Sequence, residues 1–533
     1  MPLPILPFGA ERYLIQNSLR FRRASSARLS NALAVAGDRK TFEVSCWVKR
    51  GQLAVGGIWN GSSSQIGGIR FMSLANADGV DDALLVGFNG NNVLQTNAVF
   101  RDTTGWYHIL LSVDTTHATS SERVKLYVNG VQITSFSFTS YPAQNTDLNW
   151  NSTDTASIGA SWSGIYYFDG LISEFISVSG TRFGPNAYGR FNAAGHWVPR
   201  RFNNLYGAKG FHLKFLDASA ATAAAIGKDS GPNAINWTPT NISVTAGPTF
   251  DQMRDTPTRN MPTLTPLIAH NGGTLTNANL GYTRGSTSAH GAAATQRALP
   301  TTGKHGWEVI SCAATNNDSI GVADITVSPQ LPGGGSEIGN RSGALDYIYR
   351  SNGIKASNGS TSAYGATFTS GSAITVLWDA DAGQISFRKD GVDQGVAFSG
   401  ITPVAGKFAP AVSSAESSGV VHFNFGQRPF AYALPAGYTA LGEAKVNTTV
   451  SSGTFTGNAS SDGRVVDIGG TPTTLTINGN AVTWGTHAIK LANGFKIITS
   501  SSSYNTAGSN SWSATGIVPF QAGRNHFNNA QVN

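Results

Sequence analysis

Charge and cysteine are both scarce in this chain, and each scarcity excludes a class of protein. Only 13% of the 533 residues are charged, about half of what ordinary globular domains carry. The two cysteines, Cys46 and Cys312, lie far apart in apolar, strand-like segments. This usage excludes a disulfide framework and a cysteine-based metal site, and it predicts two buried free thiols.

Long apolar runs and helical periodicity are also lacking. No apolar run is long enough to span a bilayer, and the first residues, MPLPILPFG, have no basic start or clear cleavage site. The best helix candidate, the alanine-rich segment after Asp217, is short. We therefore expect no transmembrane segment, and a protein made in a cytosol that reaches its place by assembly or lysis.

The net charge of +7 is spread thinly over the sequence. Four arginines gather near the start, at positions 20, 22, 23 and 28, but no basic run is interleaved with aromatic residues as in a base-stacking surface. We expect no nucleic-acid partner. A mild attraction to acidic surfaces, such as phosphate-bearing envelopes, is compatible with this charge.

Glycine, by contrast, is abundant, at 62 residues, and short alternating segments recur between turn residues. VKLYVNGVQITSF begins at Val124, and QISFRKDGVDQGVAF begins at Gln384. Each is an alternating strand, a turn of Asn129-Gly130 or Asp390-Gly391, and a second strand, which is a strong β-hairpin signal. The chain is predicted to be all-β.

The order of the segments in the first half carries a family resemblance. TFEVSCWVK, GWYHILLSVD, VKLYVNG, SIGAS and FDGLISEFISVSG follow one another between residues 15 and 260. This series resembles the laminin-G-like, concanavalin-type jelly-roll family, in a variant similar to domains of bacteriophage tail-fibre-like and appendage proteins. The resemblance implies a sandwich of two antiparallel sheets and a place on a virion.

The second hairpin stands in a different context. Residues 261–441 resemble a SPRY domain, also a concanavalin-like sandwich. The matching segments are Trp307-Glu308-Val309, Gly321-Val322, Asp379 with Asp381-Ala382-Gly383, Asp390-Gly391, Ala409-Pro410-Ala411 and Asn424-Phe425-Gly426. The two hairpins therefore belong to two related folds and are not one copied repeat.

These resemblances divide the chain into four parts. We predict tandem concanavalin-like antiparallel β-sandwiches, laminin-G-like and then SPRY-like, plus a small C-terminal β domain. The parts are an N-terminal attachment arm (1–17), the laminin-G-like sandwich with its extension (18–250), the SPRY-like sandwich (251–445), and the C-terminal domain with a tail (446–533).

Glucanases share the concanavalin-like fold and carry acids at alternate positions of one strand. Here the alternation places Glu174 beside Ile172 and Ile176, and Glu308 beside Gly306 and Ile310, so no second carboxylate is expected near either. Asp379 and Asp381 do alternate, but the SPRY resemblance places them at a turn that they would cap. No nucleophile elbow is present, and His108 lies in a strand. We predict no catalytic residues.

No pair of histidines has close metal-binding spacing. Laminin-G-like domains often bind calcium, and Asp147, Asp154 and Asp169 lie in predicted loops, but they make no EF-hand pattern. We expect no cofactor and no metal site, with calcium as the less favoured alternative.

Aromatic residues gather next to amides and an acid between residues 149 and 169. Ring faces can stack on the apolar faces of sugars while polar groups meet the hydroxyls. The predicted carbohydrate-binding residues are Trp150, Trp162, Tyr166, Tyr167 and Asp169. The alternative is that these rings cover one end of the sandwich or pack against a neighbouring subunit.

The sequence thus favours a non-enzymatic virion structural protein, a tail fibre or similar appendage that binds a host-surface glycan or envelope component, or virion proteins. Its apolar, proline-punctuated arm is expected to dock on other virion proteins, and the resemblance to fibres implies a homotrimer. The alternatives are a polysaccharide depolymerase on a glucanase-like sandwich, and a head-decoration protein or adhesin.

Overall fold

The computed structural model describes most of the chain. The described residues are 13–443 without 72–81, 162–164, 193–194, 267–272, 285–290, 313–317, 327–336, 342 and 415–418, then 474–483 and the C-terminal strands named below. These residues contain no α-helix. Apart from strands, they form four short 3-10 turns: η1 (Arg23–Ser25), η2 (Ser120–Glu122), η4 (Pro185–Ala187) and η6 (Leu441–Glu443). The all-β prediction is confirmed.

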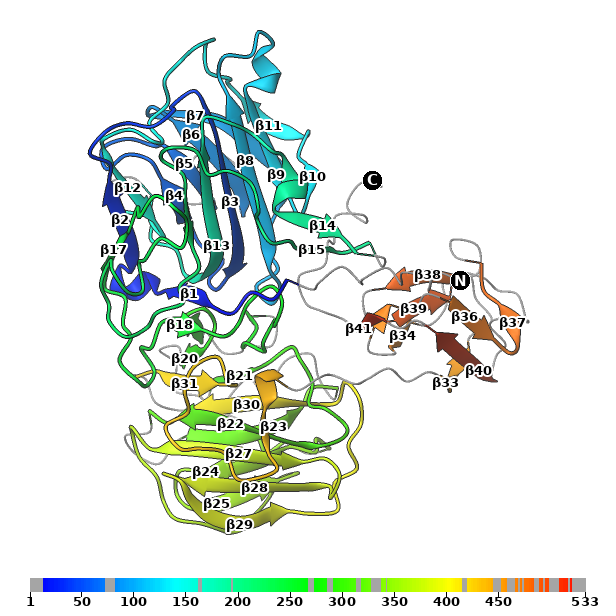
Figure 1. Ribbon diagram of the computed structural model, residues 1–533. Helices are drawn as coiled ribbons and strands as arrows, with labels where there is room; N and C mark the ends of the chain where they lie inside the picture. Colours follow the sequence, from blue (N-terminus) through cyan, green and yellow to red (C-terminus); the bar gives the residue numbers. More distant parts are fainter. Residues whose placement is uncertain are drawn as a thin grey trace, which may run out of the picture.

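Two antiparallel sheets form the first sandwich (Figure 1). One runs β10 (Val131–Gln132), β9 (Val124–Val128), β8 (Tyr107–Asp114), β3 (Thr41–Arg50), β13 (Gly170–Ser179), β1 (Ser18–Phe21) and β18 (Gln252–Met253), with β16 (Phe211–Leu213) beside β13. The other runs β11 (Phe136–Thr139), β7 (Asn91–Val99), β6 (Ala83–Phe88), β5 (Gly68–Phe71), β4 (Gly56–Asn60), β12 (Thr155–Ile158), β2 (Arg28–Ala32) and β17 (Thr238–Thr240). A two-stranded ribbon, β14 (Gly189–Phe191) and β15 (Trp197–Pro199), accompanies them.

Alternating burial fixes how these strands face the core. In β9, Val124, Leu126 and Val128 are buried while the two residues between them are half-buried. They join one continuous cluster of aliphatic and aromatic side chains between the two sheets. The turn that follows is the predicted one, because Asn129 and Gly130 both have positive φ, 49° and 79°.

The second sandwich follows in the chain. One sheet runs β19 (Thr274–Thr276), β20 (Gly281–Thr283), β31 (Val421–Asn424), β22 (Lys304–Ile310), β27 (Ala373–Asp379), β28 (Gln384–Lys389) and β29 (Val392–Phe398), with β32 (Thr439–Ala440) parallel to β22. The other runs β21 (Gly291–Ala294), β30 (Phe408–Ser414), β23 (Asp318–Asp324), β24 (Tyr347–Arg350), β25 (Ile354–Ser357) and β26 (Ser360–Ala363). Asp390 and Gly391 form the second predicted turn, with φ of 49° and 80°.

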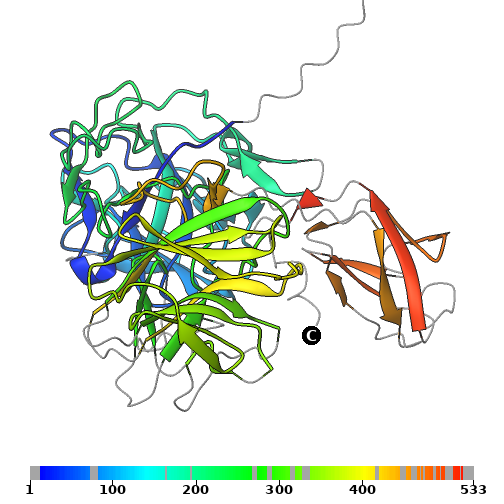
Figure 2. The same cartoon turned by 90° about the horizontal axis from the view of Figure 1, so that it is seen from below.

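The C-terminal strands make three further small sheets, drawn to one side of the sandwiches in both views (Figures 1 and 2). They are β33 (Ser452–Gly457), β40 (Gly508–Thr515), β36 (Thr474–Ile477) and β37 (Asn480–Ala481); β34 (Val465–Asp467), β39 (Gly494–Ile497) and β38 (Ala488–Leu491); and β35 (Gly470–Thr471) with β41 (Val518–Pro519).

The segment between the two sandwiches is buried, and it is hydrogen-bonded both to the first sandwich and to the residues that lead into the second. Asp255 is inaccessible to solvent, and its carboxylate accepts hydrogen bonds from Lys49 Nζ (2.7 Å), Trp106 Nε1 (3.1 Å) and the Met261 amide (3.1 Å). One apolar cluster contains Trp47 and Trp106 together with the core of the second sandwich. The two sandwiches therefore share a packed junction.

Residues 13–17, which we assigned to the arm, pack against this junction. Ile15 is buried; its amide donates to Thr258 Oγ1 at 3.0 Å, and its carbonyl accepts from the hydroxyls of Thr256 and Thr258. Residues 1–12 of the predicted arm lie outside the described part of the chain.

Candidate functional site

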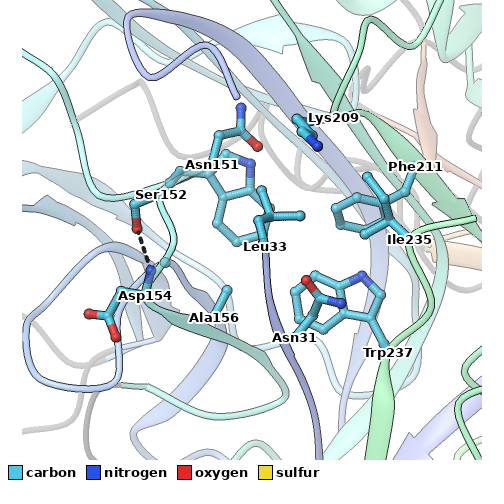
Figure 3. A pocket seen from close by; sticks show the side chains of 12 residues that line it. Asn31, Leu33, Asn151, Ser152, Asp154, Ala156, Lys209, Phe211, Ile235 and Trp237 are labelled. Atoms are coloured by element: carbon cyan, nitrogen blue, oxygen red, sulfur yellow. Dashed lines mark hydrogen bonds between the residues drawn. The ribbon is translucent and has the colours of Figure 1, made fainter. Parts of the chain in front are cut away.

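A shallow recess opens at one edge of the first sandwich, where five separate segments of the chain meet (Figure 3). Its enclosed space is only about 20 Å³, room for about one water molecule, so a larger ligand would lie over its mouth. The residues around it are Asn31, Leu33, Gly61, Trp150, Asn151, Ser152, Asp154, Ala156, Lys209, Phe211, Ile235 and Trp237.

The loop before β12 is held in place by backbone geometry. Asn151 has a φ of 60°, a left-handed conformation that asparagine tolerates better than most residues. Its carbonyl accepts from the Gly37 amide at 2.8 Å, and its side-chain Nδ2 donates to the Asp38 carbonyl at 2.8 Å. A Cβ on Gly61 would lie 2.9 Å from the Trp150 backbone, so only glycine allows this close approach.

The floor of the recess is aromatic. The rings of Trp150 and Trp237 are stacked with centroids 6.3 Å apart, and Phe211 lies 5.1 Å from Trp237. Trp150 Nε1 donates to Ser177 Oγ at 3.1 Å. The buried Trp237 Nε1 has no hydrogen-bond acceptor among the described residues, which is unusual for a buried indole.

Charged groups flank this floor on opposite sides. The Asp154 carboxylate accepts hydrogen bonds from Ser62 Oγ, from Ser63 Oγ (3.0 Å) and from the Thr155 amide (2.7 Å). Burial alone would raise the pKa of Asp154, but these hydrogen bonds outweigh it and lower the pKa, so the carboxyl is ionised at neutral pH. The half-buried Lys209 extends toward the recess from the other side (Figure 3).

The structure separates the residues predicted to bind carbohydrate. Trp150 has only 1% of its surface exposed, so it supports the recess from below and cannot offer a ring face to a sugar. Tyr166 and Tyr167 are half-buried, with the guanidinium groups of Arg70 and Arg28 at 5.6 and 6.0 Å from their ring centroids. Neither tyrosine lines the recess, and Trp162 lies outside the described residues.

Asp169 has a structural position at the junction of the sandwiches. Its buried carboxylate accepts a hydrogen bond from the Ala278 amide at 2.9 Å. Burial raises the pKa of Asp169, with hydrogen bonds from the backbone of Ala278, Arg23 and Gln52 acting against that rise. These donors surround the carboxylate, so Asp169 anchors the second sandwich to the first.

Glu174 differs from its predicted setting because β13 is bulged. The register of β13 against β3 shifts between Ser173 and Ile176, and Glu174 has a φ of 49°. Ile172 therefore faces the core between the sheets, while Ile176 packs in a second cluster on the outer face. The expectation that Ile172, Glu174 and Ile176 share one face was wrong.

The buried Glu174 carboxylate is enclosed by hydrogen-bond partners. Its Oε2 accepts from the Tyr13 hydroxyl at 2.9 Å and lies 2.8 Å from His212 Nε2, whose Nδ1 is 3.0 Å from the Tyr206 hydroxyl. Burial would raise the pKa of Glu174, but the interactions with His212 and Tyr13 lower it. This is a satisfied polar cluster that ties residues 13 and 206–212 onto the sheet.

His108 forms a second such cluster with Ser45 and Trp197. His108 Nε2 lies 2.8 Å from Ser45 Oγ, and Trp197 Nε1 donates to His108 Nδ1 at 3.1 Å. Because an indole is a donor only, Nδ1 must be the acceptor and the proton sits on Nε2. Burial lowers the pKa of His108 to about 3. A neutral imidazole that donates to Ser45 cannot act as its general base.

The remaining acids occupy structural positions. Glu308 is buried and accepts from the Ala431 amide at 2.8 Å. Asp379 accepts from the Ala382 amide at 3.0 Å, which confirms the predicted turn cap, and pairs with Lys304 at 2.8 Å. Within the described residues, no group of three histidine, cysteine or acidic side chains is arranged to hold a metal ion.

Sequence reasoning missed Asn31, Lys209, Phe211 and Trp237, which complete the recess. They come from β2, from the segment before β16, from β16 itself and from the segment before β17. No local pattern marks them, because only the pairing of β17 and β12 with β2 brings these distant segments together.

Two family models match separate parts of the chain. Residues 23–180 match the model of the concanavalin A-like lectin/glucanases superfamily, and residues 304–428 match the SPRY domain. The chain also shows similarity to three solved structures among others. These are the SPRY domain of human HERC1 (22% identity, 30% of this chain and 93% of that chain, TM-score 0.23), another human SPRY domain (15%, 28% and 94%, 0.24), and a putative carbohydrate binding protein from Bacteroides ovatus (19%, 43% and 60%, 0.32). The chain carries a laminin-G-type, concanavalin-like domain followed by a SPRY domain.

Proposed function

We propose that this protein is a non-enzymatic component of a phage virion, a tail fibre or similar appendage, which binds a glycan of the host surface through its first sandwich. The observation that carries the proposal is the recess. It brings together two asparagine side chains, a carboxylate and an ammonium group at one edge of the sandwich, with the half-buried Leu33 and Ile235 beside them and buried aromatic rings beneath. Sugar-binding sites use this combination, because hydroxyls need both donors and acceptors beside apolar surface.

The polar clusters on the outer face of the first sheet support binding rather than hydrolysis. The carboxylate of Glu174 is buried under Tyr13 and His212, where no polysaccharide chain reaches it. A retaining or inverting glycosidase needs two carboxyl groups facing the same glycosidic bond, and a buried, hydrogen-bonded Glu174 does not meet that requirement.

The placement on the virion rests on the resemblance to phage appendage proteins seen in the sequence. In this proposal residues 1–12 attach the chain to other virion proteins, and the assembled form is a homotrimer. The packing of Tyr13 and Ile15 onto the sandwich defines where such an arm would begin. The SPRY domain provides a second binding surface for a virion protein.

A glycan panel tests the binding function. Purified full-length protein should bind host-surface polysaccharide, and Asn31→Ala should weaken that binding because it removes a half-buried amide at the recess. Asn145→Ala, in an exposed turn outside the recess, is the matched control. Equal binding by wild type and Asn31→Ala would place the glycan elsewhere.

Two further measurements test the remaining parts of the proposal. A time course with the same polysaccharide should release no reducing ends; their release would favour a depolymerase. Gold labelling of the protein on intact particles should mark an external appendage. Light scattering of the full chain, and of a chain starting at Tyr13, should give a trimer. Only the full chain should attach to particles, because the shorter chain lacks residues 1–12.

A further inference from the structure

We infer that the recess selects an acidic saccharide, such as a uronic acid residue, whose carboxylate binds Lys209. The inference rests on the proposed glycan-binding function and adds the chemical class of the sugar. It follows from which polar groups around the recess are already bonded within the protein and which are not.

Lys209 is positioned by a glycine that leaves room for its stem. A Cβ on Gly37 would lie 2.7 Å from Lys209 Cβ and 2.8 Å from Lys209 Cγ. The Gly37 amide is itself bonded to the Asn151 carbonyl at 2.8 Å, so the loop under the lysine is fixed to the wall of the recess. The side chain therefore lies across Gly37 with its ammonium end toward the recess (Figure 3).

The ammonium group of Lys209 has no bonded partner among the described residues. By contrast, the Asp154 carboxylate already accepts hydrogen bonds from Ser62, Ser63 and Thr155, which leaves little of its capacity of about four acceptor sites. Trp237 Nε1 also lacks an acceptor, but it is sealed from solvent. Of the two charged groups at the recess, the carboxylate is thus bonded within the protein and the ammonium group is not.

The shape and the charge of the site limit how an anionic sugar would bind. The enclosed space is only about 20 Å³, so a sugar ring would lie over the mouth of the recess, beside Lys209, and not inside it. The chain also carries a formal net charge of +7, which favours approach of an acidic polymer. A half-buried ammonium group bonded to a carboxylate gives a stronger hydrogen bond than any neutral pair.

The test compares two probes that differ only at C6. Binding of methyl β-glucuronide and of methyl β-glucoside to the full-length protein is measured by calorimetry or ligand-observed NMR at low salt. We expect the glucuronide to bind about tenfold more tightly, the size of effect that one hydrogen bond to a charged group produces. Added salt should weaken binding of the glucuronide and leave binding of the glucoside unchanged.

Four variants assign the effect to Lys209. Lys209→Met should remove the tenfold preference and keep the glucoside affinity, and Lys209→Arg should retain the preference. Lys228→Met, an exposed lysine outside the recess, makes the same charge change and should alter neither probe. Gly37→Ala should reduce the preference by displacing the lysine stem while Lys209 stays in the chain.

The outcomes separate the two proposals. Equal affinities for both probes, unchanged in Lys209→Met, would overturn the acidic-sugar inference while glycan binding stands. Absence of binding by both probes, together with absence of binding in the polysaccharide panel, would overturn glycan binding itself. A glucuronide preference that survives Lys209→Met but falls in Lys228→Met would also contradict the inference.

Discussion

The ammonium group of Lys49 lies 2.7 Å from the carboxylate of Asp255, and both side chains are buried at the junction of the two sandwiches. Lys49 Nζ has two further acceptors, Asn260 Oδ1 at 2.8 Å and the Met261 carbonyl at 2.9 Å. All three bonds reach from β3 of the first sandwich to the segment that leads into the second. A short linker has thus become part of a shared interior, and this limits independent movement of the domains.

Removing one member of this pair should therefore destabilise the protein strongly. Lys49→Met leaves the Asp255 charge buried without its counter-ion, and breaking a buried pair in this way costs about 3–5 kcal/mol. Urea denaturation of the full chain measures the loss. Lys40→Met is the control, because its 3.9 Å contact with Asp147 is solvent-exposed and worth at most about 1 kcal/mol. Similar losses of stability in both variants would show that the buried Lys49–Asp255 pair does not stabilise the junction.

Two hairpin glycines with the same sequence signature should differ in their tolerance of alanine. Gly90 and Gly130 each follow an asparagine and have φ of 82° and 79°. A Cβ on Gly90 meets nothing within 4 Å, whereas one on Gly130 would lie 2.3 Å from the Trp197 ring. Gly90→Ala should cost only the backbone strain, about 1–2 kcal/mol.

Gly130→Ala should cost that strain plus about 1–3 kcal/mol for displacing the Trp197 ring. Thermal or urea unfolding of the two variants measures the difference directly. Equal losses would show that the ring moves aside freely. The comparison matters because Trp197 also holds His108 in its tautomer.

Local patterns predicted the parts of the fold that depend on local physics. Asn129-Gly130 and Asp390-Gly391 form the expected turns because their positive φ values are set by the residues themselves. The bulge at Glu174 was not predictable, since it depends on how β13 pairs with β3 and on partners as distant as Tyr13 and His212. One inserted residue reversed the face on which every later side chain was expected.

The candidate site was predicted only in part for a similar reason. The aromatic cluster at residues 149–169 is visible in the sequence, but exposure is not, and Trp150 proved to be buried. Lys209 and Trp237 lie well beyond that cluster in the chain and reach the same recess through strand pairing that no local signal specifies.

Glu174→Gln should change stability and leave glycan binding intact. The substitution keeps the side-chain size but removes the negative charge of the carboxylate to which Tyr13 and His212 are both hydrogen-bonded. A lost charged hydrogen bond in a buried site costs about 1.5–3 kcal/mol. Glu174 is not among the residues around the recess. Binding to the polysaccharide should therefore match wild type, while the urea midpoint falls. Loss of a measured hydrolytic activity in this variant would instead assign Glu174 to catalysis.

Acid should destabilise the protein through His108. Its pKa is lowered by burial to about 3 in the folded chain, against about 6.5 in the unfolded chain. Below pH 6.5 the unfolded state binds one more proton than the native state, so the free energy of unfolding falls as the pH falls toward 3. At pH 5 this single group lowers it by about 2 kcal/mol relative to pH 7.5.

Urea denaturation at pH 7.5 and pH 5 measures this loss in the wild type and in His108→Gln, which cannot titrate but keeps one donor and one acceptor for Ser45 and Trp197. The variant should start less stable and lose about 2 kcal/mol less between the two pH values. His117→Gln, in a surface turn, should keep the wild-type loss. If His108→Gln loses as much stability in acid as the wild type, His108 takes up its proton without unfolding. The assignment of a buried, neutral imidazole to the Ser45–Trp197 cluster would then be wrong.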